Sequence, residues 1–172
     1  MDLDLRNFSL HLDENQRTVR RLSDMKGFYA DQEAVAQILK ESDPVIYEVY
    51  ACESEEEGPG NLSYALTVIN PGDVGGEYYM TKGHFHHKPS AELYLGLEGE
   101  GILLLQDREG NTRRIPLLPG RVSYVPANYA HRSINTGRSQ LRFLAIYQSD
   151  SGHDYGTIEK EGFRERILVQ KN

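Results

Sequence analysis

The sequence predicts an all-β fold, a barrel or double-sheet jelly roll preceded by one short helix. Short stretches that alternate apolar and polar residues recur between turn signals over most of the chain. Glycine and tyrosine are abundant, with 16 and 11 residues, and tryptophan is absent. Glycine favours turns and tyrosine favours strands, so this composition suits a β-rich domain. With 172 residues, the chain can form one domain with a sizeable core.

The N-terminal part contains the only helix that the sequence predicts. Residues 1–27 mix charges with isolated apolar positions, which favours an extended arm or an edge strand. A helix is expected over residues 31–40, because Asp31 can cap its start and Glu33 lies in its first turn. The apolar residues that follow have helical spacing. A strand is then expected at Val45–Ala51.

Eight further strands are expected between turn signals, after an acidic loop at residues 53–60. The loop contains four acidic residues and ends in a Gly-Pro-Gly run, as is typical of a solvated surface loop. Turns are expected at residues 70–73, 107–111 and 135–137. Strands of this length and spacing favour a barrel or jelly roll. The predicted strands are Leu62–Asn70, Glu77–Thr81, Ala91–Leu97, Gly101–Gln106, Thr112–Pro116, Arg121–Val125, His131–Asn135 and Leu141–Tyr147, with Arg166–Val169 as an additional edge strand.

One domain is expected to span residues 1–172, with an N-terminal arm and helix at 1–43, a barrel at 44–150 and a C-terminal segment at 151–172. The formal net charge of −7 argues against a nucleic-acid partner. The chain has no run of about 18 apolar residues and begins without the core of a signal peptide, so no membrane association is expected. Cys52 is the only cysteine, which excludes an intrachain disulfide and fits a cytoplasmic protein.

The strongest chemical signal lies in residues 81–94. His84 and His86 are two residues apart, and Glu92 begins the next apolar run after a turn. On a strand, alternate side chains point to the same face, so both imidazoles share one wall. Two imidazoles and a carboxylate on one wall are donors for a divalent metal ion. His131, in a second motif downstream, is the fourth candidate ligand.

The two motifs have a specific spacing. The first is His-x-His-x5-Glu-x6-Gly, from His84 to Gly99, and the second is Pro-x-Asn-x2-His-x3-Asn around His131. Together they resemble the metal-binding motifs of the cupin superfamily, in which three histidines and one glutamate hold a metal ion. Asn128 replaces the usual glycine of the second motif, and asparagine tolerates the left-handed backbone of a turn. The resemblance implies a cupin double-stranded β-helix, that is, a jelly-roll barrel.

A closer resemblance, from about Val45 to Phe163, is to the cupin-type glucose-6-phosphate isomerases of archaea and some bacteria. It rests on residues 81–86 (TKGHFH), 145–147 (AIY) and 152–158 (GHDYGTI). The resemblance implies an enzyme that interconverts glucose 6-phosphate and fructose 6-phosphate in glycolysis and gluconeogenesis. It also implies a sugar-phosphate substrate and a homodimer, to which the N-terminal arm can contribute a strand.

The resemblance also implies roles for residues outside the metal site. Tyrosines and a histidine would line the sugar pocket, and two threonine hydroxyls and one glycine amide would hold the phosphate. Such small donors let an anion approach the backbone closely, although the chain has no glycine-rich phosphate loop. From the residues alone, the tyrosines equally suit core positions and the histidine equally suits a plain turn. The implied substrate-binding residues are Thr67, Thr81, Gly83, Tyr94, Tyr147, His153 and Tyr155.

We expect one divalent metal ion per subunit, bound by the three histidines and Glu92. Iron is the first expectation, and manganese, nickel, cobalt and zinc suit the same donors. Isomerisation moves a hydrogen between C1 and C2, either as a proton through an enediolate or as a hydride. Glu92 is the candidate base for the first route, provided that one of its carboxylate oxygens stays free. Tyr147 or His153 can move the hydroxyl proton in either route.

Three basic residues are set aside as members of the site. His87 and Lys82 are expected to face away from the ligands, and His11 has no companion and is expected at the surface.

Two other functions stay open. The first alternative is another metal-dependent cupin enzyme, such as a dioxygenase, because a fold does not fix a function. The second is a non-catalytic sugar-binding or storage cupin. Such a protein need not keep all four ligands, so their presence favours an enzyme.

Overall fold

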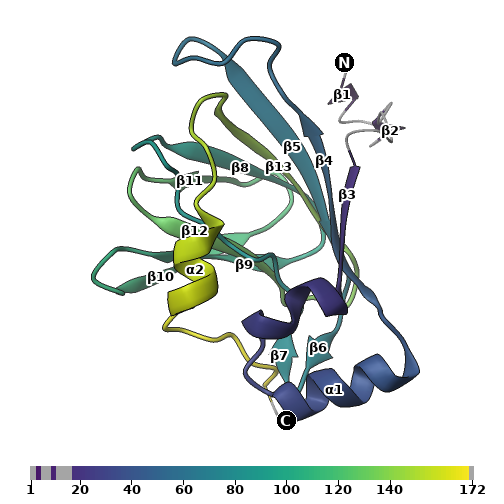
Figure 1. Ribbon diagram of the computed structural model, residues 1–172. Coiled ribbons are helices and arrows are strands. Elements are labelled where there is room, and N and C mark those ends of the chain that lie inside the picture. Colours follow the sequence, from purple (N-terminus) through teal and green to yellow (C-terminus); the bar gives the residue numbers. More distant parts are fainter. Residues whose placement is uncertain (1–2, 5–8, 11–16, 171–172) are drawn as a thin grey trace.

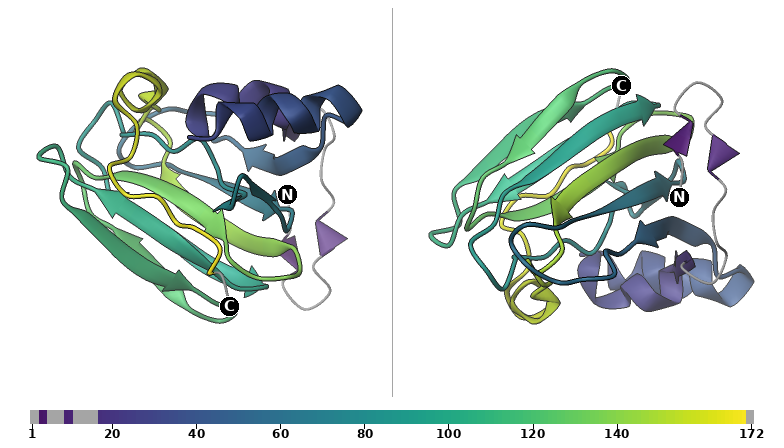
Figure 2. Two further views of the ribbon diagram at one scale, coloured as in Figure 1. Left: turned by 90° about the horizontal axis from the view of Figure 1, so that it is seen from below. Right: turned by 90° about the horizontal axis from the view of Figure 1, so that it is seen from above.

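The computed structural model describes residues 3–4, 9–10 and 17–170, and consists mainly of antiparallel strands (Figure 1). A six-stranded sheet and a three-stranded sheet form the two layers of the barrel, which Figure 2 shows from two sides. In sheet order, the six strands are β11 (Val122–Val125), β8 (Glu92–Glu98), β13 (Leu141–Gln148), β5 (Leu62–Ile69), β4 (Val45–Cys52) and β3 (Arg17–Arg21). The three strands are β10 (Thr112–Leu117), β9 (Gly101–Gln106) and β12 (Ala130–Asn135), and two short pairs join β1 (Leu3–Asp4) to β2 (Ser9–Leu10) and β6 (Asp73–Val74) to β7 (Glu77–Tyr78).

In the described part of the chain, three short helices accompany the sheets. The 3-10 helix η2 (Leu22–Phe28) and α1 (Gln32–Glu41) lie together at one end of the barrel, and α2 (Tyr155–Glu161) follows the last strand (Figure 1). Asp31 caps α1 as expected, because its side chain accepts a hydrogen bond from the Ala34 amide at 2.9 Å. Within the part of the chain that is described, no helix is both long and apolar enough to span a bilayer.

The register of the six-stranded sheet sets the arrangement of its inner face. Directly paired residues share a face of a sheet, so each ladder of partners forms a row across the strands. One row joins Ser63 of β5, Tyr147 of β13 and Glu92 of β8. A second row joins Thr67 of β5 to Phe143, which precedes Tyr147 by four residues on β13. Buried apolar side chains from both sheets form the core, among them Leu103, Leu105, Phe143, Ile69 and Leu141.

The all-β expectation is confirmed, with four differences in detail. The expected strand Glu77–Thr81 ends at Tyr78, and the expected strand Arg166–Val169 is wrong. In that segment only Leu168 forms an isolated bridge, to Glu77. The strand β7, to which Leu168 is bridged, is short because the chain turns just before β7 at Gly75 and Gly76, with φ of +61° and +85°.

The other two differences lie near the chain ends. Residues 17–21 form the edge strand β3, as expected, but the 3-10 helix η2 follows it within the region that was expected to be extended. The segment after Gly152 was expected to be a loop or turn, and its second half is the helix α2. His11 lies outside the described residues.

Candidate metal centre and pocket

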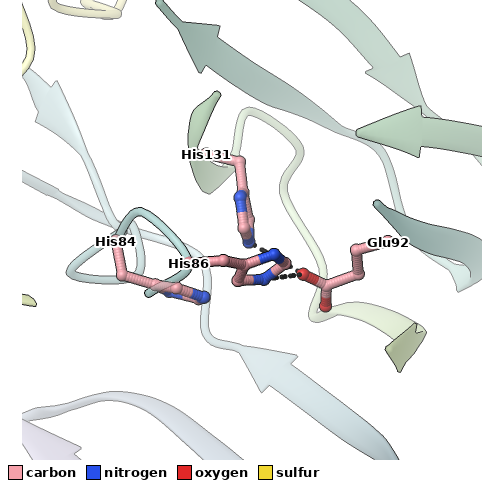
Figure 3. A group of neighbouring side chains, drawn as sticks. All are labelled: His84, His86, Glu92 and His131. Atoms are coloured by element: carbon pink, nitrogen blue, oxygen red, sulfur yellow. Dashed lines mark hydrogen bonds and ion pairs between the residues drawn. The ribbon is translucent and has the colours of Figure 1, made fainter. Parts of the chain in front are cut away.

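Four side chains converge on one point between the sheets (Figure 3). His84 and His86 belong to the extended segment between β7 and β8, Glu92 is the first residue of β8, and His131 is the second residue of β12. One donor atom from each of the four lies within 4.8 Å of the others. We call this group the metal end of the pocket.

Backbone pairing holds this geometry in place. The His84 amide donates to the His131 carbonyl at 3.3 Å, and the His131 amide donates to the His84 carbonyl at 3.1 Å. The segment forms isolated bridges, at His84 and Phe85, and is not a regular strand. Its extended backbone nevertheless directs both imidazoles to the same point (Figure 3). Asn128, in the turn before β12, has φ of +69°, as its place in the motif requires.

The hydrogen bonds of the histidines fit a metal ion. His86 Nδ1 lies 3.0 Å from both the carbonyl and the hydroxyl of Ser90, and Nε2 lies 3.2 Å from Glu92 Oε2. The carbonyl can only accept, so when it holds the Nδ1 hydrogen the Nε2 lone pair is available to a metal ion beside Glu92. His84 Nε2 and His131 Nδ1 are buried and have no hydrogen-bond partner among the described residues, while His131 Nε2 lies 2.9 Å from Glu92 Oε2. Buried nitrogens without partners are costly in a folded protein and are satisfied by a metal ion.

The ionisation states suit ligands as well. Burial, together with the neighbouring histidines, holds the pKa of His84 well below its usual value, so its imidazole is neutral. Burial alone would raise the pKa of Glu92, but the facing rings of His131 and His86 lower it to about 2. A neutral imidazole and an ionised carboxylate are the forms that bind metal.

A cavity of about 260 Å³ opens from the metal end along the inner face of the six-stranded sheet. All seven predicted substrate-binding residues line this cavity. The residues that line it include Thr67, Thr81, Gly83, Tyr94, Tyr147, His153 and Tyr155, together with His84, Glu92 and His131.

Aromatic rings form the wall next to the metal end. The Tyr94 ring stacks on Phe143 with centroids 5.1 Å apart, and it meets His131 edge-on. His153 lies 4.5 Å from the His84 ring and stacks on Tyr155, at 5.8 Å between centroids and 16° between planes. The Asp154 side chain caps α2 between these two residues. The helix start therefore fixes a pair of side chains that the sequence assigned to a loop.

A second group of polar residues lies away from Glu92, and we call it the distal end. It includes Thr67 in the second row of the sheet, and Thr81 and Gly83, which precede the histidines. The Ser133 amide donates to Thr81 Oγ1 at 3.1 Å, so the hydroxyl hydrogen of Thr81 remains free to donate. Gly83 has φ of +74°, and a Cβ there would lie 2.7 Å from the Phe163 ring. No other residue fits at this position without displacement.

Arg132, directly after the ligand candidate His131, holds the Lys82 carbonyl. Its Nε and Nη2 donate to that oxygen at 3.2 and 2.7 Å, while Phe163 packs on the guanidinium at 4.5 Å. The ammonium group of Lys82 lies 3.5 Å from Glu159, so it points away from the metal end as expected. His87 is exposed.

The lining also includes residues that were not predicted from the sequence, among them Arg20, Tyr47 and Glu53. Arg20 is paired with Tyr47 across β3 and β4, and these two residues complete the distal end. Burial raises the pKa of Tyr47 to about 12, against hydrogen bonds from the Lys82 backbone and the Arg20 side chain. Glu53 accepts a hydrogen bond from the Tyr147 hydroxyl at 3.2 Å. Only the alternation along β4 could have indicated Tyr47, and nothing local marks Arg20 or Glu53.

Comparison with solved structures supports the fold. A structure of oxalate decarboxylase superimposes with a TM-score of 0.51 at 24% identity, over 66% of this chain and 29% of that one. A variant of the Bacillus subtilis oxalate decarboxylase gives a TM-score of 0.50 at 24% identity, over 65% and 29% of the two chains. At this identity the similarity concerns the fold alone, which is the cupin barrel.

Comparison with known sequences identifies the family. The model of the glucose-6-phosphate isomerase family matches residues 19–172. A glucose-6-phosphate isomerase of Thermococcus litoralis is 51% identical over 168 residues, which are 96% of this chain and 87% of that protein. The Thermococcus kodakarensis protein of the same name is 53% identical, over 90% and 82% of the two chains, and that of Sinorhizobium medicae is 39% identical, over 87% and 71%. This chain therefore belongs to the glucose-6-phosphate isomerase family.

Proposed function

We infer that this protein is a metal-dependent aldose–ketose isomerase that interconverts glucose 6-phosphate and fructose 6-phosphate. The inference rests on one arrangement: the four-donor centre opens into the same pocket that Thr67, Thr81 and Gly83 line, and these residues are candidate donors to an anion. A sugar phosphate needs both groups, because its reacting C1 and C2 lie at one end and its phosphate at the other. The family of the relatives points to the same substrate pair.

We propose that the distal end binds the phosphate. The hydroxyls of Thr67 and Thr81 and the amide of Gly83 are small donors that an anion can approach closely. Arg20 adds a positive charge, and no carboxylate is paired with it among the described residues. A guanidinium forms strong charge-assisted hydrogen bonds with phosphate oxygens. Tyr155, whose ring lies over the pocket beside His153, closes the substrate from the side of α2.

We propose His84, His86, Glu92 and His131 as ligands of one divalent ion. When bound, that ion would polarise the oxygens on C1 and C2 and stabilise negative charge there. Iron is the first candidate, and manganese, nickel, cobalt and zinc are the alternatives that these donors accept.

The residues around the reacting carbons have distinct proposed roles. Both contacts of Glu92 with the histidines use Oε2, which leaves Oε1 as the oxygen that can act as a base at C2. Tyr94 and His153 position the sugar between the aromatic wall and Glu92. Burial lowers the pKa of His153, so its neutral ring can exchange a proton with a substrate hydroxyl. Complete retention of a C2 deuterium in the product would exclude a base that exchanges with solvent, and substantial loss to solvent would exclude a pure hydride shift.

The proposed setting is glycolysis and gluconeogenesis in the cytoplasm, with a homodimer as the assembly. The resemblance to cupin-type isomerases and the single cysteine support this setting. The negative charge of −7 argues against a nucleic-acid partner.

The test is isomerisation of fructose 6-phosphate by protein that is stripped with chelator and then reloaded with one metal at a time. We expect activity to disappear on stripping and to return with at least one of iron, manganese, nickel, cobalt or zinc. Oxygen consumption is recorded in parallel, because an oxygenase on the same fold would use it. Stoichiometric metal binding without isomerisation under any metal would overturn the proposed reaction.

A further inference from the structure

Glu53 is a second carboxylate of the pocket, and it occupies a defined place. It follows the last residue of β4 and begins the acidic loop. The Ser54 amide donates to Ser63 Oγ at 3.0 Å, and the Gly58 amide donates to Ser149 Oγ at 3.0 Å, so both halves of the loop are attached to the sheet. Among the described residues that line the pocket, Glu53 and Glu92 are the only carboxylates.

The contact of Glu53 with Tyr147 determines the direction of a hydrogen bond. The Tyr147 hydroxyl donates to Glu53 Oε1 at 3.2 Å. A phenol has a single hydrogen to donate, so the hydroxyl can only accept from any other partner. Burial, with the nearby charge of Glu53, holds the pKa of Tyr147 well above its usual value, so the phenol keeps this hydrogen at neutral pH. Toward the pocket, Tyr147 therefore presents lone pairs.

The position of Tyr147 places those lone pairs beside the reacting end of the pocket. Tyr147 is paired with Glu92 across β13 and β8, and its ring centroid lies 5.7 Å from that of His153. A substrate hydroxyl near Glu92 would thus meet an acceptor at Tyr147. Toward the substrate, Tyr147 therefore accepts a hydrogen bond and does not donate one.

We propose that Glu53 is a positioning residue of the isomerase, which fixes Tyr147 as the acceptor for a substrate hydroxyl and as the carrier of its proton. The inference rests on the proposed function. During isomerisation the O2–H bond breaks and its proton moves to the Tyr147 oxygen, while the phenol hydrogen moves to the Glu53 carboxylate. The reverse transfer delivers a proton to O1. Tyr147 stays neutral, Glu53 returns to its ionised form, and no redox partner is needed.

The acidic loop itself supplies a matched control. Glu55 is exposed, as Glu53 is, but it lies two residues away and lines no cavity that is described. Glu53→Gln and Glu55→Gln each remove one negative charge from the same loop. Any difference between the two variants therefore reports the contact with Tyr147, and a general effect of charge cancels.

The experiment measures kcat and KM for fructose 6-phosphate, with bound metal, in the wild type, Glu53→Gln, Glu55→Gln, Tyr147→Phe and the double variant Glu53→Gln/Tyr147→Phe. We expect Glu53→Gln to lower kcat about 10- to 100-fold with little change in KM or metal content. Glu55→Gln should match the wild type. The double variant should be no slower than Tyr147→Phe, because both changes remove the same relay.

Two results would overturn the proposal while leaving the isomerase intact. One is an active wild type in which Glu53→Gln behaves like Glu55→Gln. The other is a double variant whose loss equals the product of the two single losses, since independent effects multiply. A wild type that is inactive with every metal would instead overturn the proposed function, and this inference with it.

Discussion

The two ends of the pocket are built in different ways. At the metal end, three of the four donors come from one stretch of nine residues, from His84 to Glu92, and only His131 comes from elsewhere. The distal end combines residues from β3, β4 and β5 with the segment before His84. A local motif can therefore specify the first end, whereas the second depends on the register of several strands. Substitutions at the metal end should therefore change the metal content of the protein, and substitutions at the distal end should change its affinity for the substrate.

The largest effect is expected at the metal end, where two adjacent histidines allow a matched test. His86→Gln should lower metal affinity by more than about 100-fold and abolish isomerisation, because even the loss of a group that supports a ligand costs about 10- to 100-fold. His87→Gln should leave both unchanged, since His87 is exposed. Bound metal is measured by elemental analysis after dialysis. Equal metal content in the two variants would contradict the assigned centre.

A smaller effect is expected from Arg20 at the distal end. Arg20→Gln removes a charge-assisted hydrogen bond worth about 1.5–3 kcal/mol, which corresponds to a rise in KM of roughly 10- to 100-fold. Metal content should stay at the wild-type level. The control is Arg21→Gln, because the exposed Arg21 side chain donates to the Asp43 carbonyl, outside the pocket. If Arg20→Gln changed metal content instead of KM, the separation between the two ends would fail.

A weaker change of the same kind is expected from Thr67→Val, which keeps the shape of the buried side chain and removes its hydroxyl. The phosphate is charged, and a hydrogen bond to a charged group is worth about 1.5 kcal/mol at the low end, so KM for fructose 6-phosphate should rise roughly tenfold while kcat is kept. Thr136→Val, in the turn after β12, is the control for a general effect of threonine replacement. Steady-state kinetics on the metal-loaded variants provides the measurement, and an unchanged KM would remove Thr67 from the phosphate site.

The smallest effect concerns the stability of the metal-free protein. The folded-state pKa of His84 lies below its unfolded value because of burial, so the unfolded chain binds a proton that the folded chain does not. His84 therefore contributes full stability above its unfolded pKa and loses it as pH falls below about 6.5, by up to about 1.4 kcal/mol per pH unit.

Urea unfolding of the metal-free protein between pH 5 and 6.5 measures this slope. The variant His84→Gln should show a shallower dependence than the wild type. His86, whose pKa is raised by Glu92 and Ser90 against the effect of burial, acts in the opposite direction and is present in both proteins, so the difference between their slopes reports His84. Identical slopes in the wild type and the variant would show that His84 is not buried in its neutral form.

The sequence was informative wherever the signal is local. The four donors, the left-handed turn at Asn128 and the cap at Asp31 each depend on a few neighbouring residues, and the structure places them as expected. The helix α2 was missed because Gly152, Gly156 and Gly162 surround and interrupt it, and glycines usually indicate turns. Its cap at Asp154 was the available signal.

The residues that the sequence could not place are those whose environment depends on pairing between distant strands. Arg20 reaches the pocket only because β3 pairs with β4 in the register that sets it beside Tyr47. Glu53 lies in a loop whose composition is typical of a solvated surface, yet its carboxylate contacts Tyr147. A shift of one residue in the pairing of β3 with β4 would turn Arg20 outward, and no local sequence pattern fixes that register.

The central position of β13 has a consequence for how the protein is made. This strand lies between β5 and β8, and it is the last strand of the sheet to leave the ribosome. Translation proceeds at about 5–20 residues per second, so β5 waits roughly 4 to 16 seconds for its partner. During that interval the nascent chain exposes two apolar strand edges, which are sites for chaperones and for aggregation. Synthesis at a slower rate, rather than a weaker final structure, is thus the condition under which this barrel is most vulnerable.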